Sequence, residues 1–328
     1  MTGKSSFTEN LRKFIENLTF RGTVSLDFSI RICDNKYSRE IQPHYPKGQK
    51  KRGVYMPTTY AHYKFGKEVI SALPRPLQSA IENHRELFDI GVHGPDILFY
   101  YYPLKKNPVS AQGYALHDRM ADRFFLHAAE IIKRADDPAA ARAYIYGVIC
   151  HFALDSECHP YIEKMIHTSG ISHSEIEMEF DRFLLKEEYI NPVRYLGIKH
   201  IHPTRENGAL IAPFYEELTA EIAEKALKGM VFYHKLLHAP CAAKRKLLFG
   251  GMKLAGKYDS MHGMVMSLEP NPACREYCQL LKRLYSGAVP LAAGLIMQYQ
   301  KVLFEDAELP ERFRRTFGEG DKWENLRL

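Results

Sequence analysis

The sequence has no long hydrophobic run, few cysteines and a single tryptophan. No apolar stretch approaches the about 20 residues that a membrane-spanning helix needs, so we expect no transmembrane segment. The six cysteines follow no regular framework, and the N-terminus lacks the apolar core of a secretory signal. Both features indicate a reducing, cytoplasmic setting. These absences exclude small disulfide-rich proteins and integral membrane proteins. The length of 328 residues suits one large domain.

The excess of positive charge is confined to the N-terminal end. The net charge is +6, and residues 1–55 contain eleven Lys or Arg against five Asp or Glu. In the rest of the chain the two signs cancel, with 34 residues of each. A neutral body gives little support to nucleic-acid binding through counterion release. Residues 1–55 show only one short alternating stretch, Val24–Ile32, so we expect a weakly structured, basic N-terminal extension.

The stretch Cys150–Pro160 carries the densest group of metal-ligating residue types. His151, Asp155 and His159 stand four residues apart, so on an α-helix all three side chains leave one face. Polar groups on the inward face of an otherwise apolar segment are costly to bury unless something binds them, and a divalent metal ion would do so. One His-x3-Asp pair alone is more often a solvated stripe or a pair of core histidines. The neighbouring sequence favours the metal.

Further residues of the same types precede and follow this stretch. His173 and Glu177 form a second pair of a His and a carboxylate one turn apart. Upstream stand His62, Asp96 in a Gly-Pro-Asp sequence, and His117 four residues after a glycine. Of the other histidines, His93 is interpreted as structural, while His127 and His167 are left out of the site.

Hydrophobic spacing after residue 56 is helical, and it predicts an all-α fold consisting of a single multi-helical domain over residues 56–310. A polar C-terminal tail is expected over residues 311–328. The aromatic run Phe99–Pro103 is expected either to pack in the core or to hold a cationic head group or a base. Loops are expected at Phe88–Asp96 and Ile162–Ile171, and helices at residues 58–73, 111–134, 139–158, 173–184, 212–238, 240–256 and 272–304.

The ordered motifs His, Gly-Pro-Asp, Gly-x3-His, His-x3-Asp-x3-His-Pro and His-x3-Glu resemble the zinc-dependent phospholipase C family, which is related to the S1/P1 nucleases. The resemblance covers residues 56–190 by motif and the helical remainder more loosely. It implies an all-helical domain that holds two to three Zn²⁺ ions and hydrolyses a phosphodiester, with a phospholipid as the expected substrate and peripheral membrane contact as an option. It also implies one zinc held by Asp96, His117, His151 and Asp155, and a second held by His159, His173 and Glu177. In that scheme Asp155 bridges to a third ion near His62, and Asp96 is also the general base that takes the proton of the attacking water.

Two alternatives remain open on the sequence alone. An S1/P1-type nuclease would use the same metal cage on a nucleic acid, although Glu177 favours the phospholipase branch, because the nuclease branch has Asp at that place. A non-catalytic helical zinc-binding scaffold would keep the cage without turnover.

The resemblance also raises a question about the start of the chain. In the nuclease branch the first residue of the mature chain binds a zinc ion through its α-amine, and the His that shares that ion stands five positions later. Here Pro57 stands five positions before His62 and directly follows Met56. A start at Met56, with removal of the methionine, is therefore one expectation, and a genuine N-terminal arm that begins at Met1 is the other.

Overall fold

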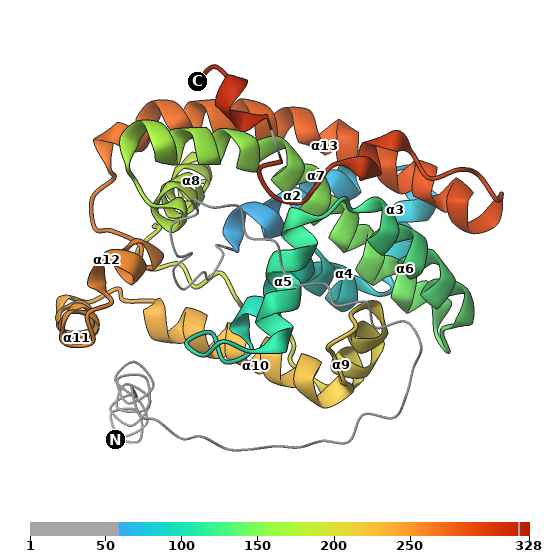
Figure 1. The fold of residues 1–328 in the computed structure, drawn as a ribbon, viewed down its shortest axis with the longest axis horizontal. Coiled ribbons are helices and arrows are strands. Elements are labelled where there is room, and N and C mark those ends of the chain that lie inside the picture. The colour runs from blue at the N-terminus through green and yellow to red at the C-terminus, as the bar shows by residue number, and fades with distance from the viewer. Residues whose placement is uncertain (1–58, 321) are drawn as a thin grey trace, which may run out of the picture.

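The structure, a computed structural model, describes residues 59–320 and 322–328. The expected extension over residues 1–55 and the start at Met56 or Pro57 lie outside this part of the chain. Among the described residues the regular secondary structure is helical, apart from one isolated bridge between Met120 and Thr316. The all-α fold class is confirmed (Figure 1), and the domain boundaries stay predictions.

The helix α7, Pro138–Ser169, runs through the middle of the molecule. It begins where the side chain of Asp137 accepts hydrogen bonds from the amides of Ala139 and Ala140, with proline at the first helical position. It ends at Gly170, whose φ of 74° lies in the left-handed region.

The predicted end of this helix at residue 158 and the predicted loop Ile162–Ile171 were wrong. Pro160 lies inside α7, where its ring nitrogen removes one backbone hydrogen bond. The helix continues because Ile162 and Met165 beyond the proline are buried against the core and favour the helical path through tertiary packing.

The helix α4, Arg85–Gly91, packs directly on α7 through two glycines. A Cβ atom on Gly91 would lie 2.1 Å from the carbonyl oxygen of Tyr144, and one on Gly147 would lie 2.4 Å from the carbonyl oxygen of Phe88. The two backbones are therefore in contact, which no larger residue at either position permits. The expected loop Phe88–Asp96 is correspondingly shorter, because α4 extends to Gly91 and a 3-10 helix, η1, begins at Gly94.

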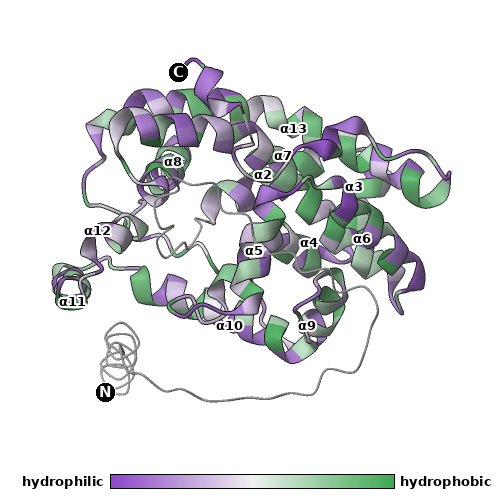
Figure 2. Cartoon of the chain, in the orientation of Figure 1, coloured by the Kyte–Doolittle hydropathy of each residue, from purple (hydrophilic) through white to green (hydrophobic). Residues whose placement is uncertain are grey.

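The other helices surround α7 and mix polar and apolar residues along their length (Figure 2). The predicted helices near residues 58–73 and 173–184 are confirmed as α2 and α8. The prediction of one helix over 111–134 was wrong, because α5 and α6 are separated by a break. The prediction over 212–238 joined η2 and α10, which are separate elements. The bounds are α2 Tyr60–Ala72, α3 Arg75–Glu82, η1 Gly94–Tyr100, α5 Pro108–Asp118, α6 Asp122–Arg134, α8 His173–Glu187, α9 Arg205–Ile211, η2 Ala212–Phe214, α10 Ala220–Leu237, α11 Ala242–Leu254, α12 Tyr258–Met261, η3 His262–Met264, η4 Pro272–Cys274, α13 Arg275–Phe304, η5 Glu311–Arg314 and η6 Trp323–Asn325.

One helix in the described part of the chain is long and apolar enough to cross a membrane by length and composition. It is α13 with the turn before it, Pro272–Phe304, and 39% of its most apolar window is buried. No such segment was expected from the sequence. The helix lies against α2 and α7 and buries a stripe that includes Tyr285, Ala292, Ile296 and Tyr299. Packing of this kind is that of a core helix.

The C-terminal segment returns to the core. Residues 311–328 were expected to form a polar tail, but Phe313 and Phe317 are 0% and 1% exposed. The backbone of the segment is also fixed, because Ala121 donates to the carbonyl of Arg315 at 2.9 Å and Gly318 donates to the carbonyl of His117 at 3.0 Å. Two aromatic side chains in an otherwise polar stretch are enough to dock it.

Candidate metal centre

All eight side chains singled out in the sequence lie in one region, where η1, α2, α5, α7 and α8 meet. Neighbouring pairs of these elements are in contact, including α7 with α2, α8 and η1. Seven of the eight residues are buried and His173 is half-buried. The set is His62 on α2, Asp96 on η1, His117 on α5, His151, Asp155 and His159 on α7, and His173 and Glu177 on α8.

Asp155 lies at the centre of the first group, and its two oxygens face different partners. Oδ1 is 3.3 Å from Nε2 of His62, whereas Oδ2 is 3.0 Å from Nε2 of His151 and 3.9 Å from Nε2 of His117. Asp96 completes the group, with Oδ1 3.2 Å from Nε2 of His117. One ligand atom each from His62, Asp96, His151 and Asp155 lie within 4.8 Å of one another. This spacing fits coordination of a metal ion by all four.

The second group is formed by one residue of α7 and two of α8. Oε1 of Glu177 lies 3.0 Å from Nε2 of His173 and 3.6 Å from Nε2 of His159. The three ligand atoms lie within 4.8 Å of one another. The pairing of His173 and Glu177 follows from their position one turn apart on the same helix. Two histidines and a carboxylate are a usual protein ligand set for zinc.

Backbone carbonyls orient two of the imidazoles. Nδ1 of His117 lies 2.8 Å from the carbonyl oxygen of Gly113, and Nδ1 of His159 lies 2.8 Å from that of Phe317. A carbonyl only accepts, so Nδ1 must carry the proton in both rings. The lone pair of each ring is then on Nε2, the atom that faces the carboxylates. Histidines that bind metals are commonly oriented in this way.

Glycine brings the η1 segment close to α7. Gly94 has a φ of +47°, and a Cβ atom there would lie 2.4 Å from Cδ2 of His151. Glycine at this position lets the segment approach the site closely. Two positions later, Asp96 is directed into the cluster.

The buried polar atoms of the first group fit a cation. Burial of a carboxylate oxygen or an imidazole nitrogen without a hydrogen bond is costly. A metal ion that accepts their lone pairs would remove that cost. In the described part of the chain, the buried atoms without a hydrogen-bond partner include Oδ1 of Asp96, Oδ2 of Asp155, Nε2 of His117, Nδ1 of His62 and both ring nitrogens of His151.

The electrostatics of the cluster also favour a bound cation. Burial disfavours the ionised form of Asp155, but His151, His159 and His62 outweigh it and hold the pKa of Asp155 well below its usual range. Burial likewise disfavours the charged form of His159, yet Asp155 and Glu177 raise the pKa of His159 to about 10. The carboxylates therefore create a strongly negative site. A metal ion can replace the protons that the imidazoles would otherwise hold.

Asp181 was missed by the sequence analysis. It is buried on α8, one turn after Glu177, and accepts hydrogen bonds from the amides of Tyr60 at 3.1 Å and Ala61 at 2.8 Å. Burial, the largest influence, raises the pKa of its carboxyl to about 7 although these amides lower it. Asp181 fixes the first turn of α2 to α8 and so places His62 beside Asp155. Its spacing of four residues from Glu177 was the available signal.

Of the histidines left out of the ligand set, His93 borders the cluster, with its ring centroid 6.3 Å from that of His62, whereas His127 and His167 lie at the surface. His93 is buried, with Nε2 2.7 Å from Nε2 of His200, which fits the structural role expected for it. His127 is exposed on α6. His167 is exposed, pairs with Glu163 at 3.0 Å and lies outside the cluster.

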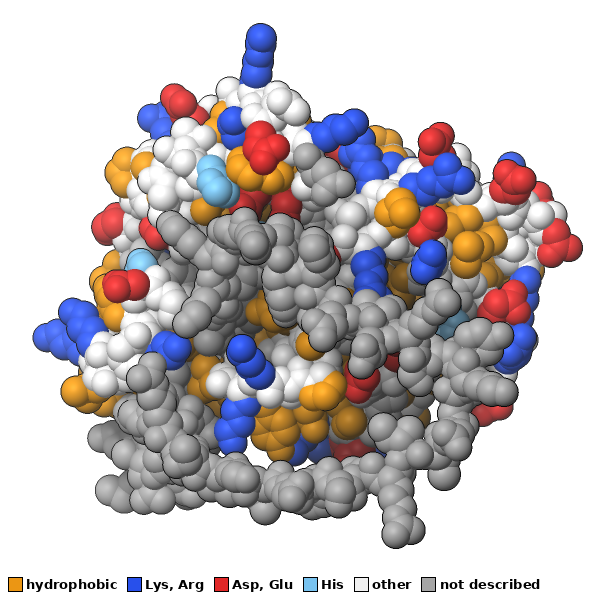
Figure 3. Space-filling view, in the orientation of Figure 1, with side chains coloured by type: hydrophobic (Ala, Val, Ile, Leu, Met, Phe, Trp, Pro, Cys, Tyr) orange, Lys and Arg blue, Asp and Glu red, His pale blue; other side chains and the backbone are white. Residues whose placement is uncertain are grey.

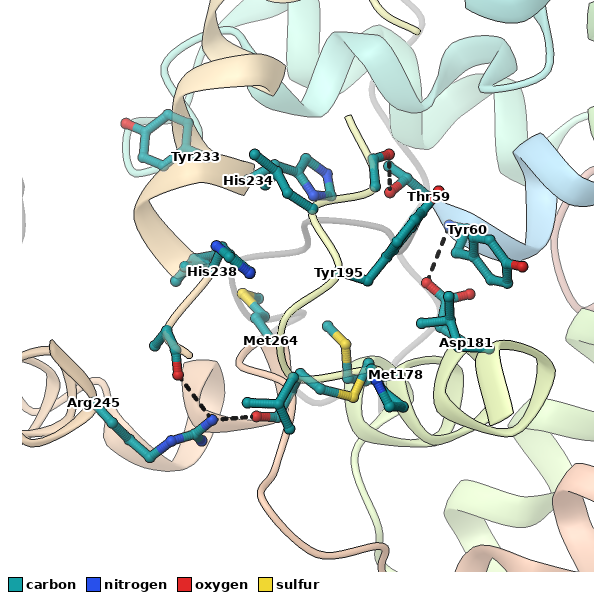
Figure 4. A pocket seen from close by; sticks show the side chains of 18 of the residues that line it. Thr59, Tyr60, Met178, Asp181, Tyr195, Tyr233, His234, His238, Arg245 and Met264 are labelled. Carbon is teal, nitrogen blue, oxygen red and sulfur yellow. Dashed lines mark hydrogen bonds between the residues drawn. The ribbon is translucent and has the colours of Figure 1, made fainter. Parts of the chain in front are cut away.

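A pocket of about 80 Å³ lies beside the cluster, between α2, α8, α10 and the segment around residue 265 (Figure 4). None of the eight candidate ligands lines it. The aromatic run that follows Asp96 divides between core and pocket. The ring centroid of Phe99 lies 5.4 Å from that of His117. Tyr100 lines the pocket, and its hydroxyl lies 2.8 Å from Nε2 of His234. Apolar and aromatic residues predominate in the lining, among them Tyr60, Tyr195, Tyr233, Met178, Met264 and Leu237.

Comparison with known proteins gives one positive result. A family model described as zinc dependent phospholipase C matches residues 61–228. No curated protein and no solved structure matches the chain. The matched segment is just over half of the chain and contains all eight candidate ligands. The chain belongs to the zinc-dependent phospholipase C family.

Proposed function

We propose that this protein hydrolyses the phosphodiester bond of a phospholipid with zinc ions held by the eight clustered residues. Membership of the family supports a zinc-dependent hydrolase. The observation that carries the proposal is the arrangement around Asp155, whose two oxygens face histidines of two different helices at 3.0 and 3.3 Å. A carboxylate in that position suits a centre of more than one ion.

The family resemblance implies that Asp96, His117, His151 and Asp155 would hold one zinc ion, and that Asp155 together with His62 would contribute to another. The distances group His62 with Asp96, His151 and Asp155, and His117 adjoins this group through Oδ1 of Asp96 at 3.2 Å. The second group of the metal centre is separate from these residues; it lies on α7 and α8 and consists of His159, His173 and Glu177. Neutral imidazoles and carboxylates, without a thiolate, are suitable zinc ligands. Cys150 and Cys158 on α7 are buried, and burial raises the pKa of both thiols, which disfavours the thiolate that a metal would need.

The protein residues have distinct tasks in such a reaction. When bound, zinc supplies Lewis-acid stabilisation of the phosphoryl oxygens and lowers the pKa of a water molecule. Asp96 is the general-base candidate, because one of its oxygens faces His117 and the carboxylate can take a proton from the attacking water. The carbonyls of Gly113 and Phe317 hold His117 and His159 in their orientation. Burial of the cluster excludes bulk water and strengthens its electrostatic interactions.

The test is an assay of the purified protein on phospholipid vesicles, a chromogenic phosphodiester and single-stranded DNA, each with and without a chelator. We expect hydrolysis of the phospholipid and the chromogenic ester, its loss with chelator, and its return on addition of zinc. Hydrolysis of DNA alone would replace the proposal by the nuclease alternative. Zinc binding without hydrolysis of any substrate would support the non-catalytic scaffold.

The variant Asp96→Asn separates the two roles of Asp96. The amide keeps an oxygen that can coordinate a metal but cannot accept the proton, so turnover should fall by about 10²-fold or more while most of the zinc stays bound. The matched control is Asp136→Asn, because Asp136 is exposed at the surface before α7. Loss of zinc in proportion to activity would make Asp96 chiefly a ligand and refute its role as base.

A further inference from the structure

The helix α11 has an apolar stripe that faces away from the core. It lies at the edge of the molecule beside α12 (Figure 1), and its buried face includes Arg245, Leu248 and Met252. At 100° per residue the opposite face is a second stripe, about 180° away. That stripe is exposed, with Leu247 45% and Leu254 84% accessible, and it consists of Ala243, Leu247, Gly250 and Leu254.

The stripe is flanked by lysines. Lys246 and Lys253 are exposed on one side of it, and Lys244 lies on the other. Residues 225–258, which include α11, contain eight Lys or Arg and no Asp or Glu, although the chain after residue 55 is neutral. Figure 3 shows basic and hydrophobic side chains next to one another at this edge of the molecule.

Arg245 links α11 to neighbouring segments of the chain. The guanidinium of Arg245 points inward and donates to the carbonyls of Ala239 at 3.2 Å and Met266 at 2.6 Å. Figure 4 shows this arginine at the rim of the pocket. The apolar stripe of α11 is therefore presented outward from a fixed position.

The segment that carries α11 also contacts the helix of the most exposed candidate ligand. His173 is the most exposed of the eight candidate ligands, with 28% of its side chain accessible. The η3 turn that follows α12 packs on the start of α8, where a Cβ atom on Gly263 would lie 3.0 Å from Cβ of Glu175 and from Oγ of Ser172. The segment that carries α11 thus borders the helix end that presents His173.

We propose that α11 is the surface through which the protein docks on an anionic phospholipid membrane. This inference rests on the proposed function, because docking would bring the protein to a membrane that contains its phospholipid substrate. A helix with an apolar stripe and flanking lysines lies in the plane of a bilayer interface, where its leucines enter the acyl boundary and its lysines meet anionic head groups. The absence of acidic residues from 225–258 makes an anionic lipid surface the complementary partner.

The test measures sedimentation of the full-length chain with vesicles of phosphatidylglycerol and of phosphatidylcholine, at low and high salt. The measurements use the Asp96→Asn background so that lipid is not consumed. We expect binding to phosphatidylglycerol that weakens at high salt, and much weaker binding to phosphatidylcholine. Lys246→Ala with Lys253→Ala should weaken binding on the order of 30-fold, because each lysine near an anionic surface contributes about fivefold.

Leu247→Ser with Leu254→Ser should weaken vesicle binding at least about tenfold by removing the inserted side chains. Matched controls lie on α6, where Leu126 is 50% exposed and Lys133 and Arg134 are exposed. Leu126→Ser, and Lys133→Ala with Arg134→Ala, should bind vesicles like the parent. Thermal unfolding midpoints check that each variant is folded.

The outcomes separate this inference from the proposed function. Without Asp96→Asn, the α11 variants should hydrolyse a soluble chromogenic phosphodiester at the parental rate and lose activity only on vesicles. Vesicle binding by a protein that hydrolyses nothing would support the docking surface and remove the proposed function. The docking proposal is overturned if the parent does not bind anionic vesicles, if the α11 variants bind like the parent, or if the leucine stripe instead mediates self-association of the chain.

Discussion

Removal of residues 311–328 should unfold the protein. The expectation follows from two phenylalanines of this segment, which are almost completely buried. The ring centroid of Phe313 lies 4.5 Å from that of Phe125 and 5.4 Å from that of Phe152, and the centroid of Phe317 lies 5.2 Å from that of Phe152. The carbonyl of Phe317 also accepts the Nδ1 proton of His159, so the truncation reaches the metal centre.

The size of the effect can be worked out from these contacts. Truncating a buried phenylalanine to alanine costs about 3–5 kcal/mol, so losing both removes about 6–10 kcal/mol. The lost hydrogen bond to His159 adds about 1 kcal/mol. The free energy of unfolding of a typical domain is only about 5–15 kcal/mol. A chain ending at Pro310 should therefore be largely unfolded at room temperature.

The measurement is thermal unfolding followed by circular dichroism, together with zinc analysis. The matched control ends at Gly320, which keeps both phenylalanines and loses the stacking of Trp323 on His167 at 4.5 Å. That contact lies at the surface and should contribute about 1 kcal/mol or less. Phe317→Leu tests the packing alone, since it leaves the backbone carbonyl in place and should cost about 1–2 kcal/mol without loss of zinc. A chain ending at Pro310 that unfolds within a few degrees of the full-length protein and binds as much zinc would refute the reasoning.

Three further outcomes test other parts of the structure. Asp155→Ala should lower the bound zinc, measured by elemental analysis, by at least one ion and abolish hydrolysis, because two groups of ligands share this carboxylate; unchanged zinc would contradict the assignment. Asp181→Ala should lower the free energy of unfolding by about 1–2 kcal/mol through loss of the amide acceptors at the start of α2, and should weaken zinc binding in the set that includes His62, measured by chelator titration. Gly91→Ala should destabilise by about 3 kcal/mol in denaturant unfolding despite the better helix propensity of alanine, because the new methyl group would meet the carbonyl of Tyr144.

The ligands could be predicted because their spacing is a local property of a helix. His151, Asp155 and His159 share a face at any position of the helix in the fold, and the same holds for His173 and Glu177. The meeting of these two helices with α2, α5 and η1 followed only from the family resemblance, because no local rule brings His62 beside Asp155.

Other features depend on tertiary contacts and left no local signal. The carbonyl of Phe317 orients His159, but a backbone carbonyl is common to every residue and marks no position in a sequence. Pro160 indicates a helix end by local rules, whereas burial of Ile162 beyond it maintains the helix. The contact between Gly91 and Gly147 likewise requires knowledge of which helices are neighbours.

The course of α7 has a consequence for how the sequence can diverge. Insertion of a single residue between His151 and His159 would rotate everything after it by about 100° about the helix axis and carry His159 away from Glu177. Residues 188–204 between α8 and α9 form turns and connections, where a change of length moves no candidate ligand. Homologous sequences that keep the centre should therefore place their insertions and deletions in such connections, and the eight-residue interval from His151 to His159 should have the same length in all of them.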